Sequence, residues 1–166
     1  MIETGKLSNI YKVRVMDDED ADDIVKLCEE NTQFYDYSNS HPAKENILND
    51  LHIAPPGKEL SSKYYVGFYD GHELIAVMDL IDGYPEDDVC FIGFFMMNRD
   101  YQGRNLGSSI INDTCGYLRE KGYRAVHLGI DKGNPQSSHF WHKNGFKDMK
   151  EIDKEGHTIV YCQRIL

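Results

Sequence analysis

Cysteine is scarce and scattered in this chain. It occurs only at positions 28, 90, 115 and 162 of 166 residues, and no two cysteines form a Cys-x-x-Cys pair. This spacing excludes the common zinc and dithiol redox motifs. We therefore expect reduced, mostly buried thiols and no bound metal.

Basic residues are also few. The chain has 18 Lys and Arg against 28 Asp and Glu, a formal net charge of -10. Because nucleic-acid phosphates are held by clustered Lys and Arg, we expect no nucleic-acid partner. An acidic surface attracts cationic or amine-bearing substrates, although solubility alone also accounts for this charge.

Long apolar runs are missing as well. The longest uncharged apolar stretch, residues 89–97, is far shorter than the roughly 20 residues that cross a bilayer. The first residues lack a basic segment followed by an apolar one, so we expect a cytoplasmic protein without membrane contact. With 166 residues and 40% apolar side chains, we expect one domain, residues 1–166, with a single core.

What the chain does contain is a candidate anion cradle within residues 91–109. An apolar run suited to a buried strand leads through a glycine-bearing turn into a helical pattern. Backbone N–H groups converge at such a junction on the positive end of a helix. Two other phosphate loops are excluded, because neither Gly-x-x-x-x-Gly-Lys-Ser/Thr nor a Gly-x-Gly-x-x-Gly after a strand is present. The cradle reads Gln-x-x-Asn-x-Gly, from Gln102 to Gly107.

The cradle sequence, Tyr-Gln-Gly-Arg-Asn-Leu-Gly at residues 101–107, resembles the pyrophosphate loop of the GNAT acetyltransferase superfamily, Gln/Arg-x-x-Gly-x-Gly/Ala. The one departure is Asn105, where the family usually has glycine. Asparagine tolerates a positive φ better than other residues apart from glycine, so we expect the same backbone shape. Without this resemblance, the segment is simply a strand-to-helix turn.

A second segment, residues 134–146, resembles the family's other coenzyme A motif. Asn134 suits an N-cap, Pro135 suits the first helical position, and Gly145 can take the left-handed conformation that ends a helix. An aromatic pair lies near the end of this predicted helix, and Gly-Phe closes it. The two motifs have the order and spacing of the superfamily.

Hydrophobic periodicity and turn residues agree with the fold that the resemblance implies. That fold class is α/β (α+β): a GNAT-like mixed, mostly antiparallel sheet of about six to seven strands with helices on both faces. Two central parallel strands, ending near Met97 and Ile130, splay apart. Tight turns are expected at Asp70-Gly71 and Glu155-Gly156. Strands are expected at residues 10–15, 64–69, 73–81, 91–97, 125–130, 146–151 and 158–164, and helices at 17–28, 42–52, 106–121 and 135–143.

The resemblance implies that acetyl-CoA binds across both motifs. Main-chain groups of residues 95–97 would pair with the pantetheine amides, while N–H groups of residues 102–108 would hold the pyrophosphate. Arg104 either adds charge toward a phosphate or is an exposed residue at a helix start. The implied cofactor-binding residues are Phe95, Met96, Met97, Gln102, Gly103, Arg104, Asn105, Leu106, Gly107, Ser108, Asn134 and Trp141.

The resemblance also implies that an amine attacks the thioester directly, without an acyl-enzyme. A main-chain N–H near Met96 or Met97 would stabilise the oxyanion. The family's usual proton donor, a tyrosine on the second-motif helix, is replaced by Trp141, whose indole does not release a proton at useful pH. Water or His142 could protonate the leaving thiolate instead, and Trp141 could equally be a packing residue. The implied catalytic residues are Met97, Trp141 and His142.

The sequence does not identify a general base. Four polar side chains lie on segments that border the acceptor pocket of this fold, and each fits a loop or surface role better: Asp79, Asp82, Tyr84 and Asp88. Aromatic residues from the first part of the chain either line that pocket or belong to the core: Phe34, Tyr35 and Tyr37.

The expected function is therefore an N-acetyltransferase that moves acetyl from acetyl-CoA to a primary amine of a small molecule or peptide. Two alternatives stay open. One is a coenzyme A-binding regulatory or sensing module, favoured by Trp141 and by the missing base, and the other is an unrelated nucleotide-phosphate binder with the same cradle. Because family members are often dimers, a homodimer is a further expectation.

Overall fold

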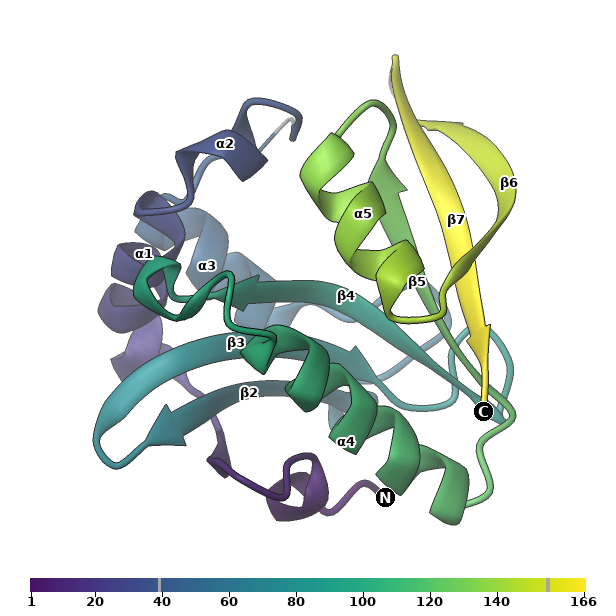
Figure 1. Cartoon of the computed structure of the whole chain (residues 1–166), viewed down its shortest axis with the longest axis horizontal. Coiled ribbons are helices and arrows are strands. Elements are labelled where there is room, and N and C mark those ends of the chain that lie inside the picture. The colour runs from purple at the N-terminus through teal and green to yellow at the C-terminus, as the bar shows by residue number, and fades with distance from the viewer. Residues whose placement is uncertain (39, 155) are drawn as a thin grey trace.

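The computed structural model describes residues 1–38, 40–154 and 156–166, and its centre is one sheet of seven strands (Figure 1). The strands are β1 (Lys12–Val15), β2 (Lys63–Asp70), β3 (Glu73–Ile81), β4 (Val89–Met97), β5 (Ala125–Asp131), β6 (Lys147–Lys154) and β7 (His157–Ile165). They lie in the order β1-β2-β3-β4-β5-β7-β6. Strands β4 and β5 are parallel, and the other neighbouring pairs are antiparallel. The predicted mixed, mostly antiparallel sheet is confirmed.

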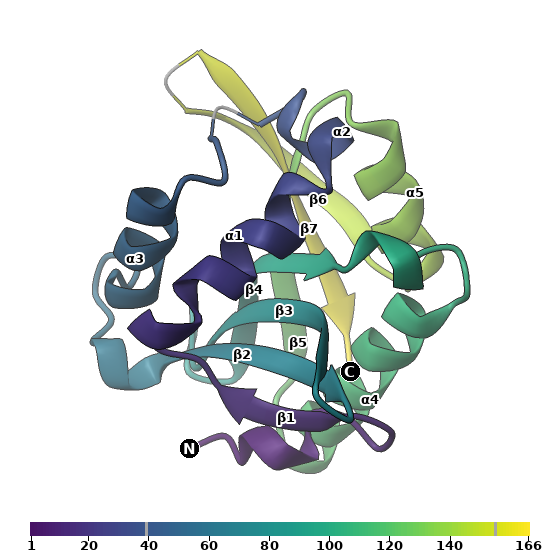
Figure 2. The same cartoon turned by 90° about the vertical axis from the view of Figure 1, so that its left-hand side faces the viewer.

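Helices cover both faces of this sheet (Figure 2). In the described residues the α-helices are α1 (Ala21–Glu29), α2 (Thr32–Tyr35), α3 (Lys44–His52), α4 (Leu106–Glu120) and α5 (Pro135–Lys143). On β3, Ala76 and Met78 belong to a buried cluster with Ile110 of α4. Val77, between them, belongs to a second cluster with Ile24 of α1 and with residues of α3. Since successive strand residues point to opposite faces, α4 lies on one face and α1 and α3 lie on the other.

Glycines end several of these elements where the sequence predicts turns. Gly71 has a φ of 60° in the β2–β3 hairpin, and Gly122 has a φ of 94° just beyond α4. The first strand begins at Lys12, two residues later than expected, because Ile10 is exposed and lies in a bend. The turn predicted at Glu155-Gly156 includes residue 155, which lies outside the described residues.

The cysteines agree with a further expectation. Cys28, Cys90, Cys115 and Cys162 are all free and buried, and burial raises the pKa of the Cys90 thiol to about 12. Thiols of this kind are poor nucleophiles. Within the described ranges, no helix combines the length and apolarity that crossing a membrane requires.

Candidate functional site

The loop between β4 and α4 has the backbone shape of an anion cradle. The chain leaves β4 through a short 3-10 turn, Arg99–Tyr101, and reverses at Gly103, which has a φ of 74°. Asn105, the N-cap of α4, has φ 59° and ψ 10° and is left-handed. Asparagine therefore takes the positive φ that was expected at this position.

The first turn of α4 leaves its backbone amides available. The Asn105 side chain makes no capping bond, and its Oδ1 accepts a hydrogen bond from Lys143 Nζ at 2.5 Å instead. Ser109 N donates to Asn105 O at 3.0 Å, whereas earlier N–H groups have no intrahelical acceptor. The helix dipole also adds positive charge here, so the amides of residues 106–108 have the arrangement that binds anions at helix N-termini.

Gly107 lets α5 and β4 pack closely against this first turn. A Cβ atom at residue 107 would lie 3.2 Å from Phe140 Cε2 and 3.4 Å from Met97 Cγ. Gly107 is itself buried. The absence of a side chain at this position thus brings the cradle, α5 and the end of β4 together.

Strands β4 and β5 diverge beside the cradle. Their parallel pairing begins at Val89 and Ala125 and ends at Ile92 and Leu128, although β5 continues to Asp131. Figure 1 shows the two ribbons splaying apart toward their carboxyl ends. The main chain of residues 93–97 therefore does not pair with β5. The predicted divergence of the two strands is confirmed, and we call the space between them the wedge.

Helix α5 closes one side of the wedge. The Asn134 side chain caps it by accepting from Ser137 N at 3.1 Å, and Pro135 occupies its first turn. Trp141 is only 8% exposed, and its ring centroid lies 4.9 Å from that of Phe140 and 5.1 Å from that of Phe146. Trp141 is therefore a packed residue at the edge of the wedge.

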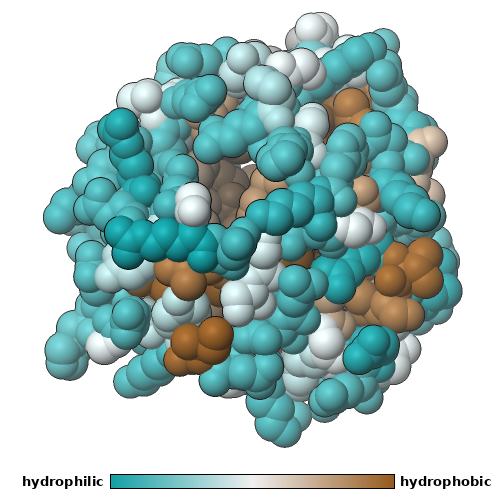
Figure 3. All heavy atoms as spheres, viewed as in Figure 1, coloured by the Kyte–Doolittle hydropathy of each residue, from teal (hydrophilic) through white to brown (hydrophobic). Residues whose placement is uncertain are grey.

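A cavity of about 880 Å³ joins the cradle, the wedge and the region of α2 and α3, a size typical of small-molecule sites. Figure 3 shows a hollow with a more hydrophobic inner wall behind a hydrophilic rim. Ten of the expected site residues line this cavity: Phe95, Met96, Met97, Gln102, Gly103, Asn105, Leu106, Gly107, Ser108 and Trp141.

Three expected site residues are not among the described residues that line the cavity: Arg104, Asn134 and His142. Arg104 is exposed, and its guanidinium carbon lies 6.0 Å from the centre of the Tyr101 ring. Asn134 is buried and is engaged as the N-cap of α5. The structure therefore favours the exposed helix-start account of Arg104.

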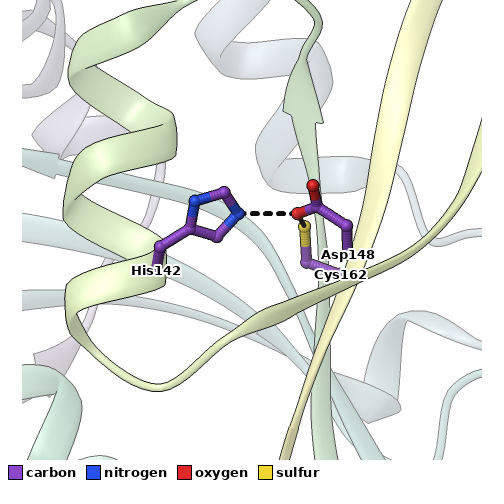
Figure 4. A group of neighbouring side chains, drawn as sticks. All are labelled: His142, Asp148 and Cys162. Carbon is purple, nitrogen blue, oxygen red and sulfur yellow. Dashed lines mark hydrogen bonds and ion pairs between the residues drawn. The ribbon is translucent and has the colours of Figure 1, made fainter.

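His142 points away from the wedge toward β6 (Figure 4). Its Nε2 lies 2.6 Å from Asp148 Oδ1, and the same oxygen accepts from Cys162 Sγ at 3.3 Å. These bonds lower the pKa of Asp148, with His142 as the largest cause. The arrangement ties α5 to the last two strands and does not bring His142 together with the other expected catalytic residues.

Two polar residues in and beside the cradle are ones for which the sequence predicts no role. Lys143 lines the cavity and bonds Asn105, as described above. Asn31, just before α2, donates from Nδ2 to Met97 O at 3.0 Å and accepts from Gln102 Nε2 at 2.5 Å. The contact of Asn31 with Gln102 spans 71 positions of the chain, so no local sequence pattern reveals it.

The far end of the cavity lies between α2, α3 and the middle of β3 and β4. Phe34 and Tyr35 line it and also pack against the core of that face. These two aromatic residues therefore both line the cavity and belong to the core. Tyr37 is not among the described lining residues. The surface interpretation of Asp79 is wrong, because this residue is 8% exposed and lines the cavity.

The other three polar residues considered as a general base have structural partners. Asp82 accepts from Tyr123 OH at 2.6 Å, and Asp88 accepts from Arg124 Nε at 2.9 Å. The Tyr84 ring packs edge-on against Phe91. These contacts agree with the loop or surface roles expected for the three residues.

The Acetyltransferase (GNAT) family model matches residues 24–146 of this chain, which include the cradle, the wedge and all of α5. The chain belongs to the GNAT family. This assignment confirms the resemblance drawn from the two motifs. It also establishes the acyltransferase class of the domain, although the family alone does not identify an acceptor.

Known relatives and solved structures agree with the family. The chain is 27% identical over 135 residues to an uncharacterised N-acetyltransferase of Staphylococcus saprophyticus, covering 76% of this chain and 86% of that protein. An acetyltransferase from Thermus thermophilus superposes with a TM-score of 0.74 at 21% identity, covering 94% of this chain and 97% of the other. The PaiA N-acetyltransferase of Thermoplasma acidophilum, solved in complex with coenzyme A, superposes with a TM-score of 0.67 at 16% identity, covering 94% and 99%. These structures show the same fold.

Proposed function

We propose that this GNAT protein transfers acetyl from acetyl-CoA to a primary amine of a small molecule or peptide by direct attack. The observation that carries the proposal is one continuous cavity that joins the α4 cradle, the β4–β5 wedge and an acceptor end. A diphosphate, an extended arm and a second substrate need such spaces in this order. The complex of the Thermoplasma acidophilum relative with coenzyme A adds support.

Coenzyme A fits the groups that the chain presents. The amides at the start of α4, between Gln102 and Ser108, would hold the diphosphate, and the cavity-lining Lys143 would add a cation. Residues 95–97 pair with β3 on one side and not with β5 on the other, and Met97 O already accepts from Asn31 and Gln102. The remaining main-chain groups on the β5 side would pair with the pantetheine amides as an added strand does.

Lys143→Ala is expected to weaken coenzyme A binding about threefold to tenfold. Its ammonium group lies at the cradle, whereas the exposed Arg104 lies outside the cavity lining. Titration calorimetry at low and moderate salt would measure the effect, which should shrink as salt screens the charge. Arg104→Ala is the matched control and should change affinity less than twofold or so. A larger loss in Arg104→Ala than in Lys143→Ala would reverse this assignment.

The chemistry assigned to the chain is mainly positioning and charge stabilisation. Acetyl-CoA supplies an acyl group activated as a thioester, and its thiol, with a pKa of roughly 8.5, needs no strong acid to leave near neutrality. A main-chain N–H near Met96 or Met97 would stabilise negative charge on the carbonyl oxygen. We assign protonation of the thiolate to water, because His142 is bonded to Asp148.

A second candidate, a coenzyme A-binding sensing module, is favoured by one observation. Trp141 occupies the place of the family's usual tyrosine and is packed among aromatic rings. Since indole cannot act as a proton donor at useful pH, this replacement would suit a protein that binds without rapid turnover.

Thiol release distinguishes these candidates. Protein, acetyl-CoA and a panel of primary amines would be mixed, free thiol followed colorimetrically, and the N-acetyl product identified by mass spectrometry. Amine-dependent release of thiol with matching product is the expected result. Thermal stabilisation by coenzyme A without any acetylated product would favour the sensing module, and stabilisation by ATP or NAD but not by coenzyme A would reject both.

A further inference from the structure

A carboxylate is buried at the acceptor end of the cavity. Asp79, on β3, is 8% exposed, and its Oδ2 lies 2.6 Å from Nζ of Lys63, whose side chain is 4% exposed. Within the described chain, Asp79 Oδ1 is buried and has no hydrogen-bond partner. A buried carboxylate oxygen without a hydrogen bond lowers the stability of the fold. The ion pair with Lys63 satisfies Oδ2 and leaves Oδ1 without a partner.

The backbone is shaped around this carboxylate. The β3–β4 register pairs Asp79 with Phe94 and Leu80 with Ile92, so Gly93 bulges out of the ladder. A Cβ atom at Gly93 would lie 2.7 Å from Asp79 Oδ2. The bulge and the glycine therefore make room for the carboxylate at the first residue beyond the end of the β4–β5 pairing, where the wedge opens.

The charges nearby are unbalanced. Asp50, on α3, lines the same cavity. Burial raises the pKa of Asp79, the Lys63 ammonium opposes the rise, and the Asp50 carboxylate adds to it. With all three groups ionised, Asp50, Asp79 and Lys63 leave one negative charge. A water molecule could bond Oδ1 but would not balance that charge, whereas an ammonium group does both.

Aromatic rings complete this end of the cavity. The rings of Tyr35, Tyr65 and Phe94 are among its lining, and Lys63 Nζ already lies 5.9 Å from the centre of the Tyr65 ring. Aromatic faces attract cations and shelter the carbon chain of an aliphatic amine. A carboxylate-bearing ligand would instead meet Asp50 and Asp79.

We propose that Asp79 Oδ1 receives the ammonium group of the acceptor and accepts the proton that this nitrogen loses before attack. This inference rests on the proposed acetyltransferase function and specifies its acceptor as an aliphatic primary amine without an adjacent carboxylate. A proton passes from R–NH₃⁺ to the Asp79 carboxylate. The nitrogen lone pair then forms the C–N bond, the C–S bond breaks with its electrons going to sulfur, and the second nitrogen proton is lost to water. Water protonates the thiolate, and Asp79 returns its proton to solvent.

The acceptor class is tested with a matched pair of amines, n-pentylamine and norleucine, which differ only in the α-carboxylate. Wild-type protein should acetylate n-pentylamine at least about tenfold more efficiently than norleucine, judged by kcat/KM. Equal or better use of norleucine would overturn the acceptor assignment while leaving the acetyltransferase function intact.

The role of Asp79 is tested by Asp79→Asn. We expect kcat/KM for n-pentylamine to fall about 100-fold or more, with coenzyme A affinity within about twofold of wild type. The control Asp82→Asn makes the same change three residues later, at a carboxylate bonded by Tyr123, and should leave kcat/KM unchanged. Retention of kcat/KM within about threefold by Asp79→Asn would overturn the role.

Two further measurements test the Asp79 site if Asp79→Asn does not fold or if no amine is acetylated. If Asp79→Asn does not fold because Lys63 loses its partner, the double variant Lys63→Met with Asp79→Leu removes both charges and should show the same loss. If wild-type protein acetylates no amine, the proposed function fails. The site itself is then tested by calorimetry with n-pentylamine in the presence of coenzyme A. Binding by wild type and not by Asp79→Asn would support the ammonium site, and no binding by wild type would reject it.

Discussion

Gly107→Glu is expected to abolish coenzyme A binding. A Cβ atom at residue 107 would already crowd Phe140 Cε2 at 3.2 Å. The rest of the side chain would carry a negative charge to the amides that we assign to the diphosphate. Both effects act against the ligand, so we expect affinity to fall more than about 100-fold. Titration calorimetry with coenzyme A measures the change directly.

The control for this prediction is Gly116→Glu on the same helix. A Cβ atom at residue 116 would meet nothing within 4 Å, so this variant adds the same charge to α4 without filling the cradle. It should bind coenzyme A with affinity close to wild type. Gly107→Ala, which adds size without charge, should lie between the two. If Gly107→Glu folds and still binds within about threefold of wild type, the cradle is not the diphosphate site.

The cradle and α5 could be predicted from sequence because local chemistry defines them. A left-handed Asn105 and an Asn134 cap followed by Pro135 are properties of short segments, and the structure has each of them. Gly145, with a φ of 84°, ends α5 in the same way. Features of this kind depend on neighbouring residues and hardly on the rest of the fold.

Asp79 could not be predicted because its burial depends on distant parts of the chain. Its cationic partner, Lys63, lies 16 positions earlier on β2. The space for its carboxylate comes from a bulge at Gly93 on β4. A single aspartate in an apolar strand gives no sign of such a partner. Sequence alone therefore favours a surface position for Asp79, and the structure shows that this is wrong.

The sequence also could not predict which side chains of α5 point into the cavity. An α-helix turns about 100° per residue, so neighbouring residues face different surroundings. Trp141 and Lys143 line the cavity, whereas His142 bonds Asp148 on β6. His139 and Lys143, four residues apart and hence on one side of the helix, both line the cavity.

Trp141→Ala is expected to lower the free energy of unfolding by about 3–5 kcal/mol. The indole is 8% exposed and packs between Phe95, Phe140 and Phe146. Its removal would leave a void where α5 meets the sheet. For a chain of this size, the melting temperature should fall by about 6–20 °C. Thermal and denaturant unfolding followed by circular dichroism would measure both quantities.

Trp141→Phe separates packing from catalysis at the same position. It retains an aromatic ring against Phe140 and Phe146 but removes the indole N–H, the one polar group that Trp141 could offer to a substrate. If Trp141 acts by packing, this variant should be much more stable than Trp141→Ala and should keep kcat within about threefold of wild type. A stable Trp141→Phe variant with kcat reduced more than about tenfold would instead assign the indole N–H a direct contact with the reacting groups.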